Sequence, residues 1–496
     1  MPPVWKMSPS LARPVLLLSL VCLVIAVSAR GASAQTKLED RIGRILSDRR
    51  YRKSSIGIHV VALDTGRVIY SRNATARFIP ASNEKLVTAA AALEALGEHY
   101  EFRTAVYGAG TMDGALLRGD LILRGGGDPT LGGRREDEDA LTIFQRWARV
   151  LKARGLRRVA GDIVADDTFF DRVYRHPHWS EEQAWKWYYP TTCALSVNDN
   201  CVIVTVKPGA SPGDAAVVST EPASAPVELF NACKTSAKRQ SIWFSRKPGD
   251  DVITVGGLVQ VGSSGYSGEV TVPNPPLYAA ALLKQALKAE GIQVDGRPRL
   301  ADGRDLAREA GATPLCVRRT ALVPVLRAMI KQSHNHYAEQ VFKTIGAEAA
   351  GRGSWESGAA RAARMLRDFG LRDDEFNLDD GSGLSRQNRL TPQLLTTILT
   401  RMHGSDHAGT FLSLLSIAGE DGTLEKRLTE PPYRGNVRAK TGYIGGVGAL
   451  SGYATTRAGT EVAFSILVND SPTASGGYSM REILDAICRA IVDCAE

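Results

Sequence analysis

The chain has 496 residues and a formal net charge of +8, and 44% of its residues are hydrophobic. This length is enough for two or three domains with large buried cores. The positive charge is spread along the chain, with no basic run interleaved with aromatic residues, which excludes a nucleic-acid-binding protein and suits work beside an anionic cell envelope.

The first 34 residues are typical of a secretory signal peptide. Lys6 and Arg13 give a positive start, residues 15–27 are apolar, and Ala32-Ser33-Ala34 offers small residues for cleavage before Gln35. The apolar stretch is shorter than the roughly 20 residues that a spanning helix needs, and a retained N-terminal anchor is the alternative. We therefore expect export across the inner membrane to the periplasm, with the mature protein either free there or held at the envelope.

Six cysteines follow this segment, and an even count in an exported protein permits disulfides. Two pairs are close enough in sequence to be candidates, namely Cys193 with Cys201 and Cys488 with Cys494. Buried thiols are the alternative. No cysteine stands in a context that favours a reactive thiolate.

In chain order, residues 55–73 alternate apolar and polar positions around an Asp-Thr-Gly turn, which predicts a β-hairpin. Residues 82–96 are rich in helix formers and are followed by Gly97, which predicts a helix that begins at Ser82. Residues 98–315 read as strand-rich, with a helix near 277–290. Helices are expected between 321 and 418.

Three short strands are predicted at 436–440, 448–455 and 461–469, followed by an amphipathic helix at 480–492. The N-terminal hairpin and these strands can complete one antiparallel sheet flanked by helices, an α+β fold. We therefore expect one domain built from residues 35–97 and 316–496, interrupted by an insertion of two subdomains at 98–315.

The string Ser82-Asn83-Glu84-Lys85 is the first of three that carry chemistry. One helical turn places the Ser82 hydroxyl and the Lys85 ammonium on the same face of the helix. A lysine that is desolvated and near a second cation such as Lys440 loses its proton more easily and can accept the serine proton. The alternative is a serine that caps the helix and a surface lysine.

The second string, Ser333-His334-Asn335, lies at a junction between two predicted helices. The Ser333 hydroxyl can pass a proton to a leaving amine, and Asn335 can bond a substrate amide. The same pattern occurs at Ser71 and Ser196, so the junction is what distinguishes Ser333. A helix cap is the alternative.

The third string, Lys440-Thr441-Gly442, occurs once and lies on a predicted strand. Such an edge can pair with an extended peptide while lysine and threonine hold a carboxylate, and Gly442 leaves room for the backbone of the substrate. An exposed strand end is the alternative.

Two histidine pairs resemble metal ligands, His176 with His178, and His334 with His336 beside Glu339. Such pairs in loops are usually solvated, and no further ligand is spaced to close a site, so we expect no metal centre.

Taken together, the three strings resemble the active site of penicillin-binding proteins and serine β-lactamases. The 251-residue gap between Ser82 and Ser333 and the strings at 119–129, 380–385 and 418–424 resemble the peptidase S13 family of D-alanyl-D-alanine carboxypeptidases/endopeptidases. In that family an insertion after the nucleophile helix interrupts the catalytic domain.

This resemblance implies that Ser82 is the acylated nucleophile and Lys85 its general base. It implies that Ser333 and Asn335 assist proton transfer and orient the peptide, while Lys440 binds a carboxylate. Thr441 and Gly442 would bind substrate, and the backbone N–H groups of Ser82 and Tyr443 would form the oxyanion hole. Asp166-Asp167-Thr168 resembles a stretch that the family uses near the side-chain amine of the substrate.

The implied reaction is hydrolysis of D-Ala-D-Xaa bonds in peptidoglycan stem peptides and cross-links, without a metal or an organic cofactor. β-Lactams would acylate the same serine as covalent inhibitors, and no nucleic acid partner is implied. A β-lactamase or esterase, and a non-catalytic cell-wall-binding protein, are the alternatives from other classes.

Overall fold

The computed structural model describes residues 37–132, 139–223, 225–303, 305, 312–471 and 478–495. The expected signal peptide at 1–34 lies outside this part of the chain. None of the described helices combines the length and the apolar character needed to cross a membrane.

The central sheet joins the two ends of the chain. Its six strands follow the order β17-β18-β19-β20-β1-β2, and all neighbours are antiparallel. The strands are β1 (Ser55–Ala62), β2 (Val68–Arg72), β17 (Ser416–Ile417), β18 (Arg438–Ile444), β19 (Val447–Thr455) and β20 (Glu461–Asn469). The predicted sheet is therefore confirmed, although the strand expected at 436–440 begins at Arg438 and continues to Ile444.

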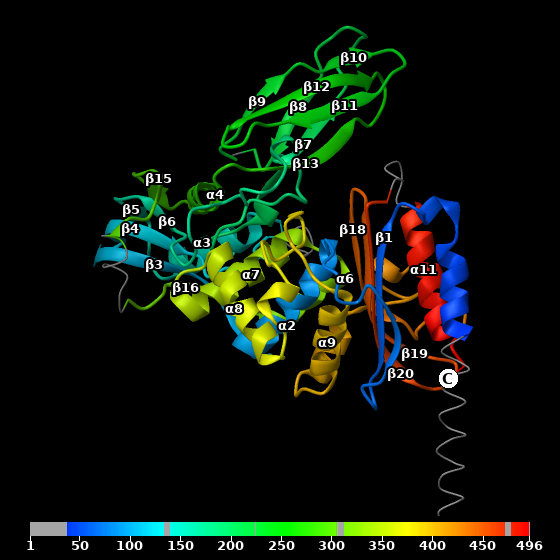
Figure 1. The fold of residues 1–496 in the computed structure, drawn as a ribbon. Coiled ribbons are helices and arrows are strands. Elements are labelled where there is room, and N and C mark those ends of the chain that lie inside the picture. Colours follow the sequence, from blue (N-terminus) through cyan, green and yellow to red (C-terminus); the bar gives the residue numbers. More distant parts are fainter. Residues whose placement is uncertain are drawn as a thin grey trace, which may run out of the picture.

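Helices cover both faces of this sheet. In Figure 1, α11 lies on one side of the sheet, and helices such as α2 and α9 lie on the other. Alternate side chains of β20 divide between the faces: Phe464 and Ile466 belong to the core with α11 and the helix at 37–46, while Ala463 and Leu467 belong to the core with the other helices. The helices are α2 (Glu84–Leu96), α6 (Leu322–Lys331), α7 (Asn335–Ala350), α8 (Trp355–Asp368), α9 (Pro392–His403), α10 (Ala408–Leu414) and α11 (Tyr478–Val492).

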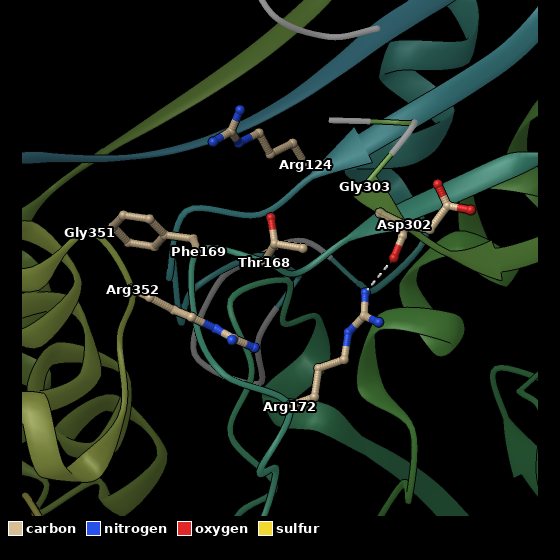
Figure 2. Close-up of a pocket in the computed structure, with 9 residues that line it drawn as sticks. Arg124, Thr168, Phe169, Arg172, Asp302, Gly303, Gly351 and Arg352 are labelled. Atoms are coloured by element: carbon tan, nitrogen blue, oxygen red, sulfur yellow. Dashed lines mark hydrogen bonds between the residues drawn. The ribbon is translucent and has the colours of Figure 1, made fainter. Parts of the chain in front are cut away.

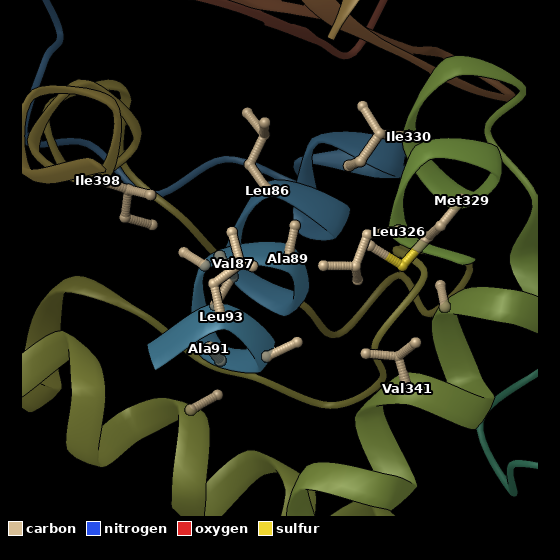
Figure 3. Packing of buried hydrophobic residues seen from close by; sticks show 14 of the residues in the cluster. Leu86, Val87, Ala89, Ala91, Leu93, Leu326, Met329, Ile330, Val341 and Ile398 are labelled. Atoms are coloured by element: carbon tan, nitrogen blue, oxygen red, sulfur yellow. The ribbon is translucent and has the colours of Figure 1, made fainter. Parts of the chain in front are cut away.

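Helix α2 is the centre of the helical layer. Its small side chains, such as Ala89 and Ala91, let α6 and α7 approach closely, and Leu326 and Val341 fill the space between them (Figure 3). The helix begins at Glu84 rather than at Ser82, because residues Ala81–Asn83 form a 3₁₀ turn, η2, in front of it. It ends at Leu96 with Gly97 as its C-cap, as predicted.

The insertion contains three sheets. A seven-stranded sheet lies beside the helical layer with α3 (Thr142–Ala153) and α4 (Pro275–Ala289), and a three-stranded and a four-stranded sheet lie beyond it (Figure 1). The first comprises β3 (Glu101–Asp113), β4 (Leu116–Arg124), β5 (Arg158–Val159), β6 (Ile163–Asp166), β14 (Gln293–Val294), β15 (Pro298–Leu300) and β16 (Cys316–Ala321). The others comprise β7 (Cys201–Lys207), β8 (Val217–Glu221) and β13 (Tyr266–Thr271), and β9 (Glu228–Asn231), β10 (Lys234–Ser236), β11 (Ser241–Ser245) and β12 (Val252–Gln260).

Strand β16 bears on the insertion boundary expected at 315/316, which stays a prediction. Strand β16 pairs with β3 along its whole length, from Cys316 opposite Val106 to Ala321 opposite Glu101. We therefore propose that the insertion ends at Ala321 and that the helical layer resumes at Leu322. The seven-stranded sheet on the one hand, and the three-stranded and four-stranded sheets on the other, support two subdomains.

The six cysteines in the described part of the chain are not joined by disulfides. All six are buried thiols. Burial raises the pKa of Cys193 and Cys488, which keeps these thiols protonated. The alternative of buried thiols therefore replaces the two candidate pairs.

Replacing Leu326 with alanine tests the helical core. Leu326 is fully buried between α6 and α2, so Leu326→Ala should lower the free energy of unfolding by about 2–5 kcal/mol. Val68→Ala, at a position that is 45% exposed, should change it by less than about 0.5 kcal/mol. Urea denaturation followed by circular dichroism measures both; equal effects would contradict the packing described for α2.

Candidate active site

The 3₁₀ turn η2 and the first turn of α2 bring Ser82 and Lys85 together. Ala81 adopts a left-handed φ of 45°, and Ser82 follows it at the wall of a cavity. Lys85 is fully buried, and its Nζ donates a hydrogen bond of 3.0 Å to Ser82 Oγ. The expected pairing of hydroxyl and amine is present, and a surface position for Lys85 is excluded.

Lys85 has two further acceptors, each from a distant segment. Its Nζ donates to Asn335 Oδ1 and to the carbonyl of Ser382, both at 2.7 Å. The Asn335 side chain in turn donates through Nδ2 to the carbonyl of Tyr188 at 2.7 Å. All three protons of the ammonium thus have an acceptor, and the geometry holds the amine against the serine oxygen.

Burial lowers the pKa of Lys85 to about 7, while the nearby carboxyl groups of Glu339, Asp380 and Glu84 act in the opposite direction. The desolvation expected from the sequence is therefore the main cause. The pKa of Lys440 is well below its usual value, first because of burial and then because of the charge of Lys85.

The carboxyl groups behind Lys85 were not predicted. Glu84 is fully buried, no described residue donates a hydrogen bond to its oxygens, and burial raises its pKa well above the usual value. Glu339 Oε2 accepts from Trp355 Nε1 at 2.7 Å and from the N–H of Gly381 at 3.2 Å, and burial raises its pKa to about 7. Glu84 lies inside the first string, but nothing in that string signals that it is buried.

Ser333 lies in the turn between α6 and α7, as the sequence indicated, with a left-handed φ of 58°. It lines a cavity of about 410 Å³ together with Ser82. The intervening His334 is buried and turns away from this cavity, with Nε2 3.2 Å from Asp199 Oδ2. His334, the middle residue of the Ser333-His334-Asn335 string, therefore does not form part of the cavity wall.

Strand β18 forms the opposite wall of this cavity. Thr441, Gly442 and Tyr443 line it, Tyr443 at the rim with 48% of its surface exposed. A Cβ atom on Gly442 would lie 3.1 Å from the backbone nitrogen of Ser82 and 3.0 Å from the carbonyl of Pro80. A side chain at this position would therefore require the strand or the serine segment to shift by a few tenths of an ångström.

Lys440 lies behind this wall and is fully buried. Its carbonyl accepts from Asn83 Nδ2 at 3.0 Å, and its Nζ donates to the carbonyl of Thr441 at 2.8 Å. Five predicted residues thus line the cavity and three support it from behind, namely Ser82, Ser333, Thr441, Gly442 and Tyr443, and Lys85, Asn335 and Lys440.

Several cavity residues were missed. Thr423, whose Oγ1 accepts from Thr441 Oγ1 at 2.8 Å, belongs to the string at 418–424 and was within reach of sequence reasoning. Lys426, Arg427 and Arg481 add positive charge to the lining, and Arg427 is paired with Asp485 at 2.6 Å. These three basic residues belong to no motif, so nothing in the sequence marks them as part of the cavity.

A second cavity, of about 650 Å³, lies away from Ser82. Arg124, Arg172 and Arg352 surround it together with Thr168 (Figure 2). Asp166 and Asp167 are fully buried next to it, with Asp166 3.6 Å from Arg124 and Asp167 2.9 Å from Arg172. The resemblance of this stretch to a segment near the side-chain amine of the substrate stays a prediction; its two carboxylates pair with arginines beside this second cavity.

The histidine pairs differ from expectation. His176, His334 and His336 are buried rather than solvated, and His178 is half exposed. Asp379, distant in sequence, lies next to His176 and His178 and completes a group of three possible metal ligands. Asp379 reaches the two histidines through the packing of distant segments, which their spacing in the sequence does not reveal.

Comparison with known proteins identifies the relatives of this chain. The D-Ala-D-Ala carboxypeptidase 3 (S13) family matches residues 38–490. A D-alanyl-D-alanine carboxypeptidase of Actinomadura sp. (strain R39) is 34% identical over 97% of this chain and 89% of the relative. D-alanyl-D-alanine carboxypeptidase DacB of Haemophilus influenzae is 26% identical over 88% of each chain.

The fold is also found in a solved structure. The crystal structure of penicillin-binding protein 4 from Haemophilus influenzae superposes with a TM-score of 0.79 at 24% identity, covering 92% of this chain and 99% of the other. The same protein has been solved in complex with a β-lactam. The α+β fold with its interrupted sheet is confirmed.

Proposed function

The chain belongs to the D-Ala-D-Ala carboxypeptidase 3 (S13) family, and on this premise we propose that it is a serine carboxypeptidase/endopeptidase that hydrolyses D-Ala-D-Xaa bonds in peptidoglycan stem peptides and cross-links. The observation that carries the proposal is the buried amine of Lys85, 3.0 Å from Ser82 Oγ. A nucleophile with a positioned base is needed for acyl transfer but not for binding.

The first step is acylation of Ser82. The neutral amine of Lys85 accepts the hydroxyl proton while Ser82 Oγ attacks the carbonyl carbon of the penultimate D-Ala. A pKa of about 7 leaves a large share of Lys85 unprotonated at neutral pH. The C–N bond then breaks, and the hydroxyl of Ser333, on the same cavity, relays a proton to the leaving amine.

The cavity walls orient the peptide. The N–H groups of Ser82 and Tyr443 stabilise the oxyanion, a role that suits the close approach of β18 to the serine. Asn335, held by Tyr188 and Lys85, bonds the peptide amide. The cationic lining favours a terminal carboxylate, and a carboxylate beside Lys440 raises the pKa of that lysine and restores its charge.

Water then releases the acyl group. Lys85, protonated during acylation, has passed its proton on and can accept a proton from the attacking water. A β-lactam places its strained amide where the peptide bond lies and acylates Ser82 in the same way. Because peptidoglycan is the substrate, we place the mature protein in the periplasm, free or associated with the envelope.

The nucleophile is tested with penicillin and intact-mass measurement. The wild-type protein should gain the mass of one penicillin, mapped to Ser82 by digestion, and the adduct should persist. Ser82→Ala should gain none and keep its melting temperature, whereas Ser71→Ala, at an exposed serine of β2, should behave as wild type. An adduct on Ser82→Ala would refute the assignment, and rapid loss of the adduct with drug hydrolysis would indicate a β-lactamase.

The pH dependence of acylation tests the base. Since protonated Lys85 cannot accept the serine proton, the rate constant of acylation should fall about tenfold per pH unit below a pKa of about 7 and level off above it. Stopped-flow measurement with a chromogenic cephalosporin between pH 5 and 9 gives the profile. A flat profile would contradict general-base catalysis by Lys85.

Gly442 tests the approach of β18 to the serine. A Cβ atom there would press on the backbone of Ser82 and Pro80, so Gly442→Ala should slow acylation at least about tenfold by moving the oxyanion donors. Gly445→Ala, on the same hairpin with no atom within 4 Å of a new Cβ, is the matched control and should leave the rate unchanged. Equal rates for both variants would contradict the proposed oxyanion hole.

A further inference from the structure

A cluster of three side chains outside the catalytic cavity has the geometry of a metal site. His176 and His178 come from the loop after β6, and Asp379 comes from the segment before α9. His178 Nδ1 lies 3.0 Å from each carboxylate oxygen of Asp379, and His176 Nε2 lies 3.7 Å from its Oδ2. One ligand atom from each residue lies within 4.8 Å of the others.

We propose that His176, His178 and Asp379 bind a divalent transition metal ion of the Zn²⁺ class. Ligand atoms about 2.0–2.1 Å from a tetrahedral Zn²⁺ lie roughly 3.3 Å apart, so the observed separations need only small side-chain movements. Two imidazoles and one carboxylate suit Zn²⁺, whereas Mg²⁺ and Ca²⁺ prefer oxygen ligands. The fourth position is left to water.

The surroundings hold the three ligands in place. The ring of His176 packs against the rings of Trp179 and Trp355, with centroids 5.6 and 4.8 Å away. Asp379 Oδ2 accepts a hydrogen bond from Ser385 Oγ. Contacts of this kind, made by the ligating side chains to their neighbours, orient the ligands before an ion arrives and are common around zinc.

Binding has a definite cost at His176. Its Nε2 faces the carbonyl of Asp379 at 2.9 Å, and its Nδ1 accepts from the N–H of His178 at 3.2 Å. An ion on Nε2 replaces the ring proton there and requires the proton on Nδ1, which gives up both of these hydrogen bonds. The ion reaches the site from solvent, because the side chain of His178 is 44% exposed.

The ion would link two segments that meet at the catalytic lysine. The Asp379 segment continues to Ser382, whose carbonyl accepts from Lys85, and the histidine loop continues to Tyr188, whose carbonyl accepts from Asn335. Trp179 Nε1 already joins them by donating to Asp380 at 2.8 Å. A metal bridge should therefore stabilise the folded protein.

Binding is measured by isothermal titration of ZnCl₂ into the untagged, chelator-treated mature protein, with MgCl₂ as a second titrant. The wild type should bind one Zn²⁺ and melt at a higher temperature when it is bound, and it should bind no Mg²⁺. His178→Ala should weaken this binding at least about tenfold and abolish the rise in melting temperature. His403→Ala, at an exposed histidine elsewhere, should match the wild type.

The outcome is independent of the proposed function, since binding and melting are read without substrate. A circular dichroism spectrum and a metal-free melting temperature equal to those of the wild type verify that His178→Ala is folded. A wild type that binds no Zn²⁺, or a folded His178→Ala that binds it with unchanged affinity, overturns the proposal; the pair is then an ordinary hydrogen-bonded contact between loops.

Discussion

The candidate active site is built around one buried amino group. Lys85 has no exposure to solvent, and its three protons go to Ser82, Asn335 and Ser382. Removing an ammonium ion from water costs several kcal/mol unless its hydrogen bonds are replaced. The acceptors come from three segments that are far apart in sequence, so the lysine ties these segments together at the point where the serine has to be held.

The sheet explains how such distant segments meet. Strands β1 and β20 pair along eight residues, from Ser55 opposite Asn469 to Ala62 opposite Val462, and so join the two ends of the chain. The chain between α2 and α6 can therefore form the insertion and rejoin the helical layer without displacing the site. The insertion nevertheless contributes to it, because the carbonyl of Tyr188 accepts from Asn335 and fixes the orientation of that amide.

Local patterns predicted the parts of this structure that depend on local geometry. The one-turn spacing of Ser82 and Lys85 predicted that their side chains meet. The alternation of apolar and polar residues predicted the strands of the central sheet. Backbone acceptors such as Ser382 and Tyr188 carry no side-chain signature. The pairing of β16 with β3 spans more than 200 residues, and the burial of His176 needs Trp355. These features arise from packing, which spacing along the chain does not encode.

The carboxyl groups beside Lys85 explain why its pKa lies near neutrality rather than at an extreme. Burial alone would leave the amine neutral but weakly basic, whereas three ionised carboxylates would keep it protonated. Glu84 and Glu339 are themselves buried, and their raised pKa values reduce the negative charge that acts on the lysine. The carboxylate of Asp380 accepts hydrogen bonds from the N–H groups of Gly383 and Ser385. These two bonds shape the turn that presents the Ser382 carbonyl to Lys85, while burial of the two glutamates helps to leave the pKa of Lys85 near neutrality.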